Sequence, residues 1–474
     1  MPVDMPIYLV AQRKKGVQFD GKIPPFGIMC VGKALGDAGY SVKIFHLVGE
    51  EGEKILEGAV REERPLFVGF SNCVSSTIRH DIRLSRRLHD QGVKVVWGGV
   101  FATAAPDTAL YSGYVDYVVV GDGERPAVSL AQAIENRAEP AGIPGVGYRD
   151  GEEIVIQPPS PVEPNLDNYP MGMDLIDWED YIFPDKSSEV IITSLNLSRG
   201  CPFGCSFCTN SMNPDRRLWR GYSNDYVREM VSFLKDKYKI SAVHLQDDNP
   251  FGKLKAGMEQ IENLGLKWIS AAHLQDATPE FLDWAKDCGC LNLSFGIESG
   301  SERILKKMNK RIDSETIRER MRLCGETGLQ SWGMWMAFVP GETVEDRRLT
   351  FSLMDEIYES NPIVQMHISI YKAFPGTPFW EESLKLGLKE PQTLEEWADY
   401  KGTINHLLGY NDRKIKRIWR NLRPLYYYEH QRNKLNPLLR SLLRRRLQGA
   451  RFRGPLEEGL HYARVARDAV KKIF

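Results

Sequence analysis

Short apolar segments alternate with amphipathic helices along most of this 474-residue chain, and this alternation restricts its fold more than any other feature. In the first region we expect strands at residues 7–10, 42–46, 66–70, 93–97 and 117–120. Helices of roughly 10 to 15 residues separate them, which is typical of a parallel, doubly wound sheet. The glycines that end these strands would let a ligand approach the backbone, or would serve only as tight turns.

The alternation resumes near residue 190, with predicted strands at 190–197, 242–246, 268–272, 291–295, 331–338 and 365–371. Predicted helices lie between them, for example at 224–238, 279–288, 314–327 and 343–358. These β/α units predict a partial (β/α)6 barrel of the TIM type, whose site lies at the carboxyl ends of the strands. The fold class is therefore α/β: a Rossmann-like sheet, a partial barrel and a helical, basic C-terminal region.

A chain of this length is too long for one hydrophobic core. We expect a Rossmann-like domain over residues 1–138 and a linker with a small hairpin, at 147–157, over residues 139–186. The barrel would span 187–380, and the helical basic region 381–474.

Charge is distributed unevenly between the last 64 residues and the rest of the chain. Residues 411–474 carry 18 Lys/Arg against 5 Asp/Glu, whereas residues 1–410 carry 44 against 58. Leucines at helical spacing lie among these basic residues. Such a helix can lie on an anionic membrane surface, or it can pack its leucines on the barrel and expose its arginines. No nucleic-acid-binding module is evident, so we expect no nucleic-acid partner.

The N-terminus has no basic leader followed by an apolar run, and no stretch of about 18 apolar residues could span a bilayer. Eight cysteines are too few for a disulfide scaffold of this size, and three of them are clustered. These features predict a cytoplasmic protein in which the clustered cysteines bind a metal.

The clustered cysteines are Cys201, Cys205 and Cys208, with the spacing C-x3-C-x2-C directly after the first barrel strand. Thiolates are soft ligands that suit iron–sulfur clusters or zinc. A structural zinc site requires a fourth ligand, and none is nearby in the sequence. Three thiolates on a [4Fe–4S] cluster leave one iron open to a cosubstrate. A structural zinc loop remains the alternative.

This motif resembles that of the radical S-adenosylmethionine (SAM) family, including the aromatic Phe207 before the third cysteine. The resemblance implies that SAM chelates the open iron of a [4Fe–4S] cluster. Reduction by the cluster then yields a 5′-deoxyadenosyl radical. It also implies a partial barrel, as the strand pattern predicts, and an external electron donor such as flavodoxin or ferredoxin.

Other strand ends resemble the SAM-binding positions of that family. Asp247 and Asp248 follow the second barrel strand, where carboxylates would suit the ammonium of SAM. Glu298 and Ser299 follow the fourth strand, and Gly341 follows the fifth. His273 stands where relatives often carry an arginine. It would bind the SAM carboxylate more weakly or be a core residue, with Lys307 or Lys310 as the cation instead.

The first domain resembles the cobalamin-binding domain that precedes the barrel in one subfamily. The resemblance implies that the nucleotide tail of cobalamin enters the sheet near its strand ends. The predicted cobalamin-binding residues are Ser71, Gly98, Gly99, Val100, Gly121, Gly123 and Glu124. The chain lacks a D-x-H-x-x-G motif, so cobalamin would bind without a histidine lower ligand. A vestigial domain without cofactor is the alternative.

Together these features predict a cobalamin-dependent radical SAM methyltransferase that acts on an unactivated carbon or a phosphinate. A radical rearrangement, ring formation or oxidation without methyl transfer is a second hypothesis. A non-catalytic iron–sulfur or zinc protein is a third. The substrate would be a small molecule, and aromatic side chains near the barrel would suit a hydrophobic or lipid-like one. No proton-transfer residue can be assigned.

Overall fold

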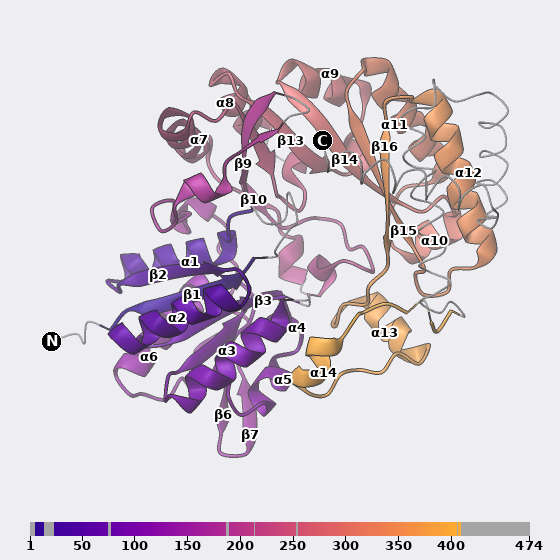
Figure 1. The fold of residues 1–474 in the computed structure, drawn as a ribbon. Helices are drawn as coiled ribbons and strands as arrows, with labels where there is room; N and C mark the ends of the chain where they lie inside the picture. Colours follow the sequence, from indigo (N-terminus) through magenta and orange to yellow (C-terminus); the bar gives the residue numbers. More distant parts are fainter. Residues whose placement is uncertain are drawn as a thin grey trace, which may run out of the picture.

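Two seven-stranded sheets, each with its own helices, form the body of the protein (Figure 1). The computed structural model describes residues 5–13, 23–73, 77–185, 189–212, 214–252, 255–404 and 406–408. The basic segment predicted to contact a membrane or pack on the barrel, residues 411–474, lies outside these residues. Among the described residues, no helix is both long and apolar enough to cross a membrane.

The first sheet has the strand order β2-β1-β3-β4-β5-β6-β7, and its first five members are parallel. Alternate residues of β1 face opposite sides, because Ile7 and Leu9 pack in one core and Tyr8 and Val10 in another. Helices α1 and α6 cover the first side, whereas α2 and α3 cover the second. The predicted doubly wound, Rossmann-like sheet is confirmed. Its strands are β1 (Ile7–Gln12), β2 (Val42–Leu47), β3 (Val68–Asn72), β4 (Val95–Gly98) and β5 (Tyr117–Val119). Its helices are α1 (Phe26–Asp37), α2 (Gly49–Glu63), α3 (Ile78–Asp90), α4 (Gly99–Ala104), α5 (Pro106–Tyr111) and α6 (Glu124–Glu135).

The predicted hairpin at 147–157 is present as β6 (Val146–Asp150) and β7 (Glu153–Ile156). It extends the first sheet, because β6 pairs antiparallel with β5 through Tyr117 and Tyr148. The exposed edge of β5 therefore obtains a hydrogen-bonding partner from a segment that the sequence pattern had placed in a linker.

The second sheet has the order β16-β15-β14-β13-β12-β9-β8. All its neighbouring strands are parallel except β8, which pairs antiparallel with β9. The two edge strands, β8 and β16, are not paired with each other. The sheet is therefore the predicted partial barrel. Its strands are β8 (Phe183–Asp185), β9 (Val190–Leu195), β12 (Ala242–Leu245), β13 (Lys267–Ala272), β14 (Cys290–Glu298), β15 (Ser331–Ala337) and β16 (Gln365–Ile370). Its helices are α7 (Asn224–Tyr238), α8 (Lys255–Asn263), α9 (Pro279–Asp287), α10 (Glu302–Lys307), α11 (Ser314–Thr327) and α12 (Val344–Ser360).

Four barrel strands, the first, second, fifth and sixth, end one or two residues before the sequence predicts, and local reasons are visible for the first and the fifth. The first ends at Leu195 because the chain turns into β10 (Ser198–Arg199), which pairs antiparallel with β11 (Arg220–Gly221). The fifth ends at Ala337 because Phe338 has a φ of 64° and leaves the extended conformation.

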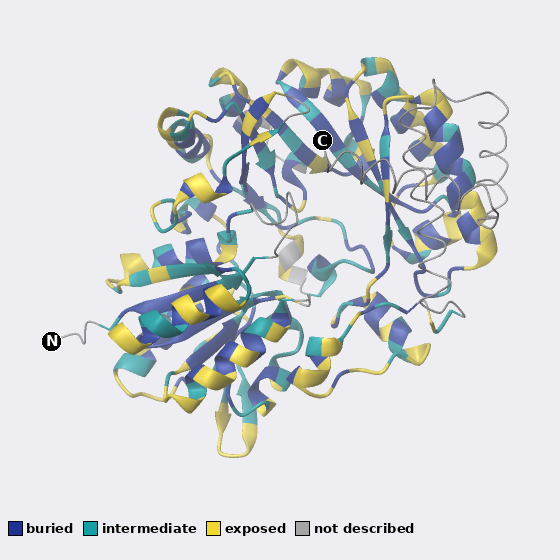
Figure 2. Cartoon of the chain, viewed as in Figure 1, coloured by how far each residue is buried: buried dark blue, intermediate teal, exposed yellow. Residues whose placement is uncertain are grey.

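Apolar contacts join the first sheet and its helices to the rest of the chain in two places. Met29 and Cys30 of α1 share a core with Trp178 and with the barrel strands. On the other side, α14 (Leu394–Asp399) packs on α3, and the ring of Trp397 lies 5.3 Å from that of Phe101. Figure 2 shows buried residues along both sheets and exposed residues on the outer faces of the helices. The helix that precedes α14 in the chain is α13 (Pro378–Lys385).

Candidate active site at the junction of the two sheets

The three predicted cluster cysteines lie on one loop that follows β10. Two hydrogen bonds attach this loop to the turn after α10: Ser206 N donates to Met308 O at 2.9 Å, and the Asn309 side-chain Nδ2 donates to Gly204 O at 2.8 Å. Gly200 has a φ of 90°, which turns the chain from β10 into the loop without the cost that a side chain would bring. The loop is therefore held by the barrel.

All three cysteines are free thiols that the surrounding protein largely removes from water. Burial raises the pKa of Cys201 to about 11 and raises that of Cys205 and Cys208. The Lys310 ammonium opposes this effect at Cys205 and Cys208, since a nearby cation favours the thiolate. Thiolates are the form that binds iron, so the donor set and its cation fit a [4Fe–4S] cluster.

Among the described residues, no three His, Cys, Asp or Glu side chains are placed to share one metal ion. This finding does not bear against a cluster, because each thiolate would bind a different iron.

Lys310 and Glu298 form a buried ion pair beside the cysteine loop. The Nζ–Oε1 distance is 3.3 Å, and both residues are less than a tenth exposed. Burial raises the pKa of Glu298, and Lys310 counteracts that shift. A Cβ atom on Gly296 would lie 2.5 Å from Glu298 Oε1 and 2.8 Å from Lys310 Nζ. Glycine at the end of β14 is therefore what leaves room for this pair.

The two adjacent carboxylates after β12 have different surroundings. Asp247 is buried and accepts hydrogen bonds from Leu197 N at 3.0 Å and from Ser198 Oγ. These hydrogen bonds hold the segment that leads into the cysteine loop in place. Burial raises the pKa of Asp247 to about 7. Asp248 is exposed, and its charge raises the pKa of Cys201 and Cys208 beyond the effect of burial. Of the two, Asp248 is the carboxylate available to a ligand.

His273 packs on the cysteine loop. Its ring stacks on Phe203 with the centroids 3.7 Å apart, and Nδ1 accepts a hydrogen bond from Gln275 N. Burial, together with the positive charge of Lys310, lowers its pKa to about 4, so the ring is neutral at pH 7. Its Nε2 is buried without a partner. A neutral ring offers no positive charge for a carboxylate.

The other predicted SAM residues are Ser299, Gly341 and Phe207, the last of which lies on the cysteine loop itself. Ser299 is fully buried, with its hydroxyl 3.2 Å from that of Thr350 on α12. Gly341 has a φ of 76°, and a Cβ there would lie 2.9 Å from Lys307 Nζ. Phe207 packs against the core shared by the first sheet and α13. Their role in SAM binding stays a prediction.

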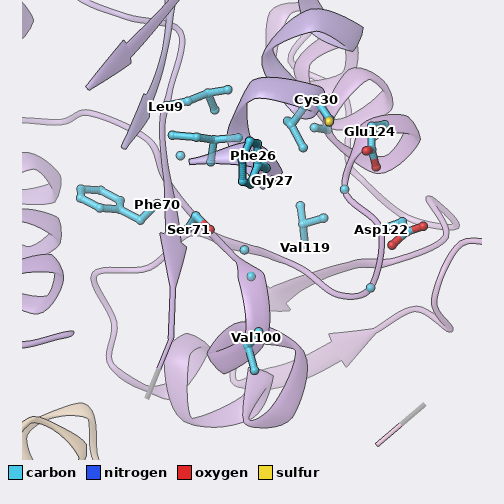
Figure 3. A pocket seen from close by; sticks show the side chains of 18 of the residues that line it. Leu9, Phe26, Gly27, Cys30, Phe70, Ser71, Val100, Val119, Asp122 and Glu124 are labelled. Atoms are coloured by element: carbon cyan, nitrogen blue, oxygen red, sulfur yellow. The ribbon is translucent and has the colours of Figure 1, made fainter. Parts of the chain in front are cut away.

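A cavity of about 440 Å³ opens at the carboxyl ends of β3, β4 and β5 (Figure 3). Figure 3 shows Cys30, Asp122 and Glu124 on one side of it and Phe70 and Ser71 on the other. Asn196 and Arg199, from the segment that directly follows barrel strand β9, also line it, so the cavity lies between the first sheet and the barrel. Every residue predicted to bind cobalamin is in its lining: Ser71, Gly98, Gly99, Val100, Gly121, Gly123 and Glu124.

The lining fits a large ligand that approaches the backbone closely. A Cβ on Gly99 would lie 2.7 Å from the carbonyl oxygen of Asn72, and one on Gly123 would lie 3.1 Å from Val31. Asn72, also in the lining, has a buried Oδ1 without a partner. Small residues and an unsatisfied acceptor suit a cofactor such as cobalamin.

Ion pairs connect this cavity to the cysteine loop, and sequence reasoning missed them. Arg199, which precedes Cys201 by two residues, donates to Glu124 Oε1 at 2.6 Å. Arg220 of β11 donates to Asp122 Oδ2 at 2.8 Å. The sequence contains an arginine two residues before the first cysteine and two acidic residues that flank Gly123. No local pattern indicated that these residues form ion pairs.

Two family models match the chain. Residues 195–354 match the radical SAM superfamily, and residues 15–131 match the B12 binding domain. An uncharacterized methyltransferase of Pyrococcus horikoshii, PH0819, is 28% identical over 73% of this chain and 74% of its own. The anaerobic magnesium-protoporphyrin IX monomethyl ester cyclase of a Synechocystis species is 26% identical over 74% of this chain and 72% of its own.

Two solved structures share the fold. The cobalamin-dependent SAM radical enzyme OxsB has a TM-score of 0.70 at 14% identity, covering 97% of this chain and 72% of its own. The radical SAM methyltransferase TsrM of Kitasatospora setae, with cobalamin and a [4Fe–4S] cluster bound, has a TM-score of 0.64 at 20% identity. That match covers 81% of this chain and 75% of TsrM. At these identities the likeness concerns the fold.

A Rossmann-like sheet and a partial barrel that meet at a three-cysteine loop define an iron–sulfur enzyme with a second cofactor cavity. Both family matches coincide with these two parts of the fold. The chain belongs to the radical SAM superfamily and carries a B12 binding domain. These two matches imply a [4Fe–4S] cluster, SAM and cobalamin as its cofactors.

Proposed function

We propose that this enzyme is a cobalamin-dependent methyltransferase that methylates an unactivated carbon or a phosphinate centre of a small molecule. The observation that carries the proposal is the position of Arg199, which lines the cobalamin cavity and lies two residues before Cys201. A methyl carrier in the cavity and a radical source at the cysteine loop would thus act on one substrate between the sheets. The name of the relative PH0819, a methyltransferase, supports the proposal.

When bound, the cluster and SAM supply a hydrogen-abstracting radical, and cobalamin supplies a methyl group. The protein's own residues bind and orient these groups. Cys201, Cys205 and Cys208 would hold the cluster, and Lys310 favours their ionised form at two of the three positions. Asp248 would accept hydrogen bonds from the SAM ammonium, while Asp247 positions the loop. The cavity glycines would admit the cofactor to the backbone of the sheet.

The test is a product analysis with methyl-labelled SAM. Anaerobically reconstituted protein, a low-potential reductant and a metabolite extract from cells lacking this protein should yield a labelled product. S-adenosylhomocysteine and 5′-deoxyadenosine should accumulate with it. The Cys205→Ala variant, treated identically, is the control and should yield none of these compounds. Label-free product together with 5′-deoxyadenosine would contradict methyl transfer.

Such a result would favour the second candidate, a ring-forming or oxidative reaction, which the similarity to the protoporphyrin ester cyclase supports. We further propose that the enzyme is cytoplasmic, that flavodoxin or ferredoxin supplies its electrons, and that its substrate is hydrophobic or lipid-like. Peripheral membrane contact through residues 411–474 would bring the enzyme to such a substrate.

A further inference from the structure

An exposed basic surface lies over part of the cysteine loop. The Arg217 guanidinium lies against the loop backbone, because a Cβ atom on Gly204 would be 2.9 Å from Arg217 Nη2. Arg311 lies close to the next residue of the loop: burial raises the pKa of Cys205, and the charges of Lys310 and Arg311 oppose that shift. Both arginines are exposed, whereas Cys205 is 8% exposed. We call Arg217 and Arg311 the basic rim of the loop.

The turn that carries Arg311 directs two neighbouring cations to different surroundings. Asn309 and Arg311 have φ angles of 53° and 56°, a left-handed conformation that is uncommon for arginine. Lys310, between them, is 6% exposed and pairs with Glu298, whereas Arg311 is exposed to solvent. Asn309 attaches the turn to the loop through its hydrogen bond to Gly204 O at 2.8 Å. Backbone strain of this kind is frequent at functional sites, where the surrounding structure maintains it.

Neither arginine of the basic rim is neutralised by a carboxylate. Among the residues that the structure describes, no ion pair includes Arg217 or Arg311. The exposed arginines Arg79 and Arg86 of α3, by contrast, pair with acidic side chains of α14. Residues 1–410 as a whole are acidic, with 44 Lys/Arg against 58 Asp/Glu. A positive surface on a negative body would steer an acidic protein toward this loop, because the rest of the body repels it.

The proposed reaction requires such a visitor. Formation of a radical from SAM consumes one electron, which has to come from outside the chain. Cys205 is buried, so a carrier protein cannot touch the metal and must instead bring its redox group close to the loop. A carrier bound at the basic rim would be placed over Gly204 and Cys205.

We propose that the basic rim is the docking surface for the electron donor, a small acidic one-electron carrier protein whose carboxylates pair with Arg217 and Arg311. The carrier gives up one electron and the cluster takes it up, with no change in covalent bonds. The inference rests on the proposed function only in requiring a cluster that a carrier protein reduces. It does not depend on methyl transfer.

The first measurement is the affinity of the reconstituted protein for an acidic flavodoxin in its oxidised form, by isothermal titration at low salt. The double variant Arg217→Glu/Arg311→Glu should bind flavodoxin about tenfold more weakly, because attraction becomes repulsion. The weakening should largely disappear at about 0.5 M salt, which screens exposed charges. The conservative variant Arg217→Lys/Arg311→Lys keeps both charges and should bind within about threefold of the wild type.

The matched control is Arg137→Glu. Arg137 follows α6, is also exposed and has a φ of 54°, so the substitution repeats the charge change and the backbone conformation of Arg311→Glu away from the cysteine loop. This control should bind flavodoxin within about twofold of the wild type, because exposed charges act over about 10 Å at moderate salt. Equal weakening in Arg137→Glu would show that only net charge matters and would overturn the docking surface.

The second measurement separates docking from an effect on the cluster itself. Two-electron-reduced flavodoxin, mixed rapidly with the protein, should reduce the cluster about tenfold more slowly in the double glutamate variant. Photoreduced 5-deazariboflavin, a small uncharged reductant that needs no docking, should reduce the variant and the wild type at the same rate. Equal slowing with both reductants, or unchanged flavodoxin binding, would overturn the proposal.

Failure of this inference is distinguishable from failure of the proposed function. A label-free product together with normal flavodoxin binding would refute methyl transfer and leave the docking surface intact. Methyl transfer driven by 5-deazariboflavin in a wild-type protein that does not bind flavodoxin would refute the docking surface alone.

Discussion

Arg199 and Glu124 form an ion pair across the junction between the two sheets, with Arg199 Nη2 2.6 Å from Glu124 Oε1. The Glu124 side chain is 3% exposed and that of Arg199 is 21% exposed, so both charges depend on each other for solvation. Glu124 begins α6 beside the cobalamin cavity, and Arg199 ends β10 before the cysteine loop. One interaction therefore joins the cavity of the first sheet to the segment that carries the three cysteines.

Removing one partner of this pair should destabilise the protein markedly. Arg199→Gln should lower the free energy of unfolding by about 3 kcal/mol, because Glu124 stays buried without its partner, whereas Glu124→Gln should cost less, because Asp122 remains 3.8 Å from Arg199. The double variant should lose less than the sum of the two single losses. Denaturant unfolding provides the measurement. The exposed pair Arg322–Glu326 is the control, since Arg322→Gln should change stability by less than about 0.5 kcal/mol. Additive losses would contradict the coupling.

Gly99 should not tolerate alanine, for reasons of space as well as conformation. Its φ is 86°, and a Cβ would lie 2.7 Å from a backbone oxygen that cannot move aside easily. Gly99→Ala should cost roughly 2–4 kcal/mol of stability and abolish cobalamin binding. Gly92→Ala separates the two causes, because Gly92 has a φ of 78° with open space around it. That control should cost only about 1 kcal/mol. Equal losses in the two variants would show that the clash contributes nothing.

Substitutions of Asp247 and of Asp248, the two carboxylates after β12, should have different effects. Asp248→Asn should weaken SAM binding by roughly tenfold, since an amide lacks the charge that attracts an ammonium. It should leave iron and sulfide content unchanged. Asp247→Asn should instead reduce cluster content, because Asp247 braces Leu197 and Ser198 before the cysteine loop. Isothermal titration with SAM and iron analysis give the two readouts. A reversed pattern would assign the ammonium to Asp247.

Stability should depend on pH through Asp81. Burial raises its pKa from 3.8 to about 7, so the folded protein binds this proton more tightly than the unfolded chain does. Stability should therefore fall as the pH rises from about 4 to 7, and Asp81→Asn should make that decline shallower. Asp247, with a pKa raised to about 7, has the same sign and should leave a residual slope.

The control for this pH dependence is Asp313, whose pKa is lowered by hydrogen bonds from Thr316. Its contribution has the opposite sign: it is complete at neutral pH and is lost as the pH falls below 3.8. Asp313→Asn should therefore leave the slope between pH 4 and 7 unchanged. Thermal melts across this range measure both variants, and a steeper decline in Asp81→Asn would reverse the sign assigned to Asp81.

The sequence alone determined the features that depend on neighbouring residues. Helices α7 and α11 begin where the sequence predicted because Ser223 and Asp313 cap their first turns, and they end there because Lys239 and Gly328 adopt left-handed conformations. The strands were predictable from apolar runs to within a few residues at their ends. In the same way, all seven predicted cobalamin residues line one cavity, since glycines at parallel strand ends meet at one edge of a sheet.

Only the tertiary structure decided which charges and polar groups meet. Arg199 and Glu124 are 75 residues apart, and Leu197 and Asp247 are 50 apart. The hairpin strand β6 joined the first sheet because β5 offered an unpaired edge, which no local pattern reports. Burial also distinguishes two adjacent aspartates: Asp247 is buried and holds the segment before the cysteine loop, whereas Asp248 is exposed and available to a ligand. Periodicity and capping act over a few residues, whereas ion pairs, desolvation and edge pairing depend on how distant segments pack.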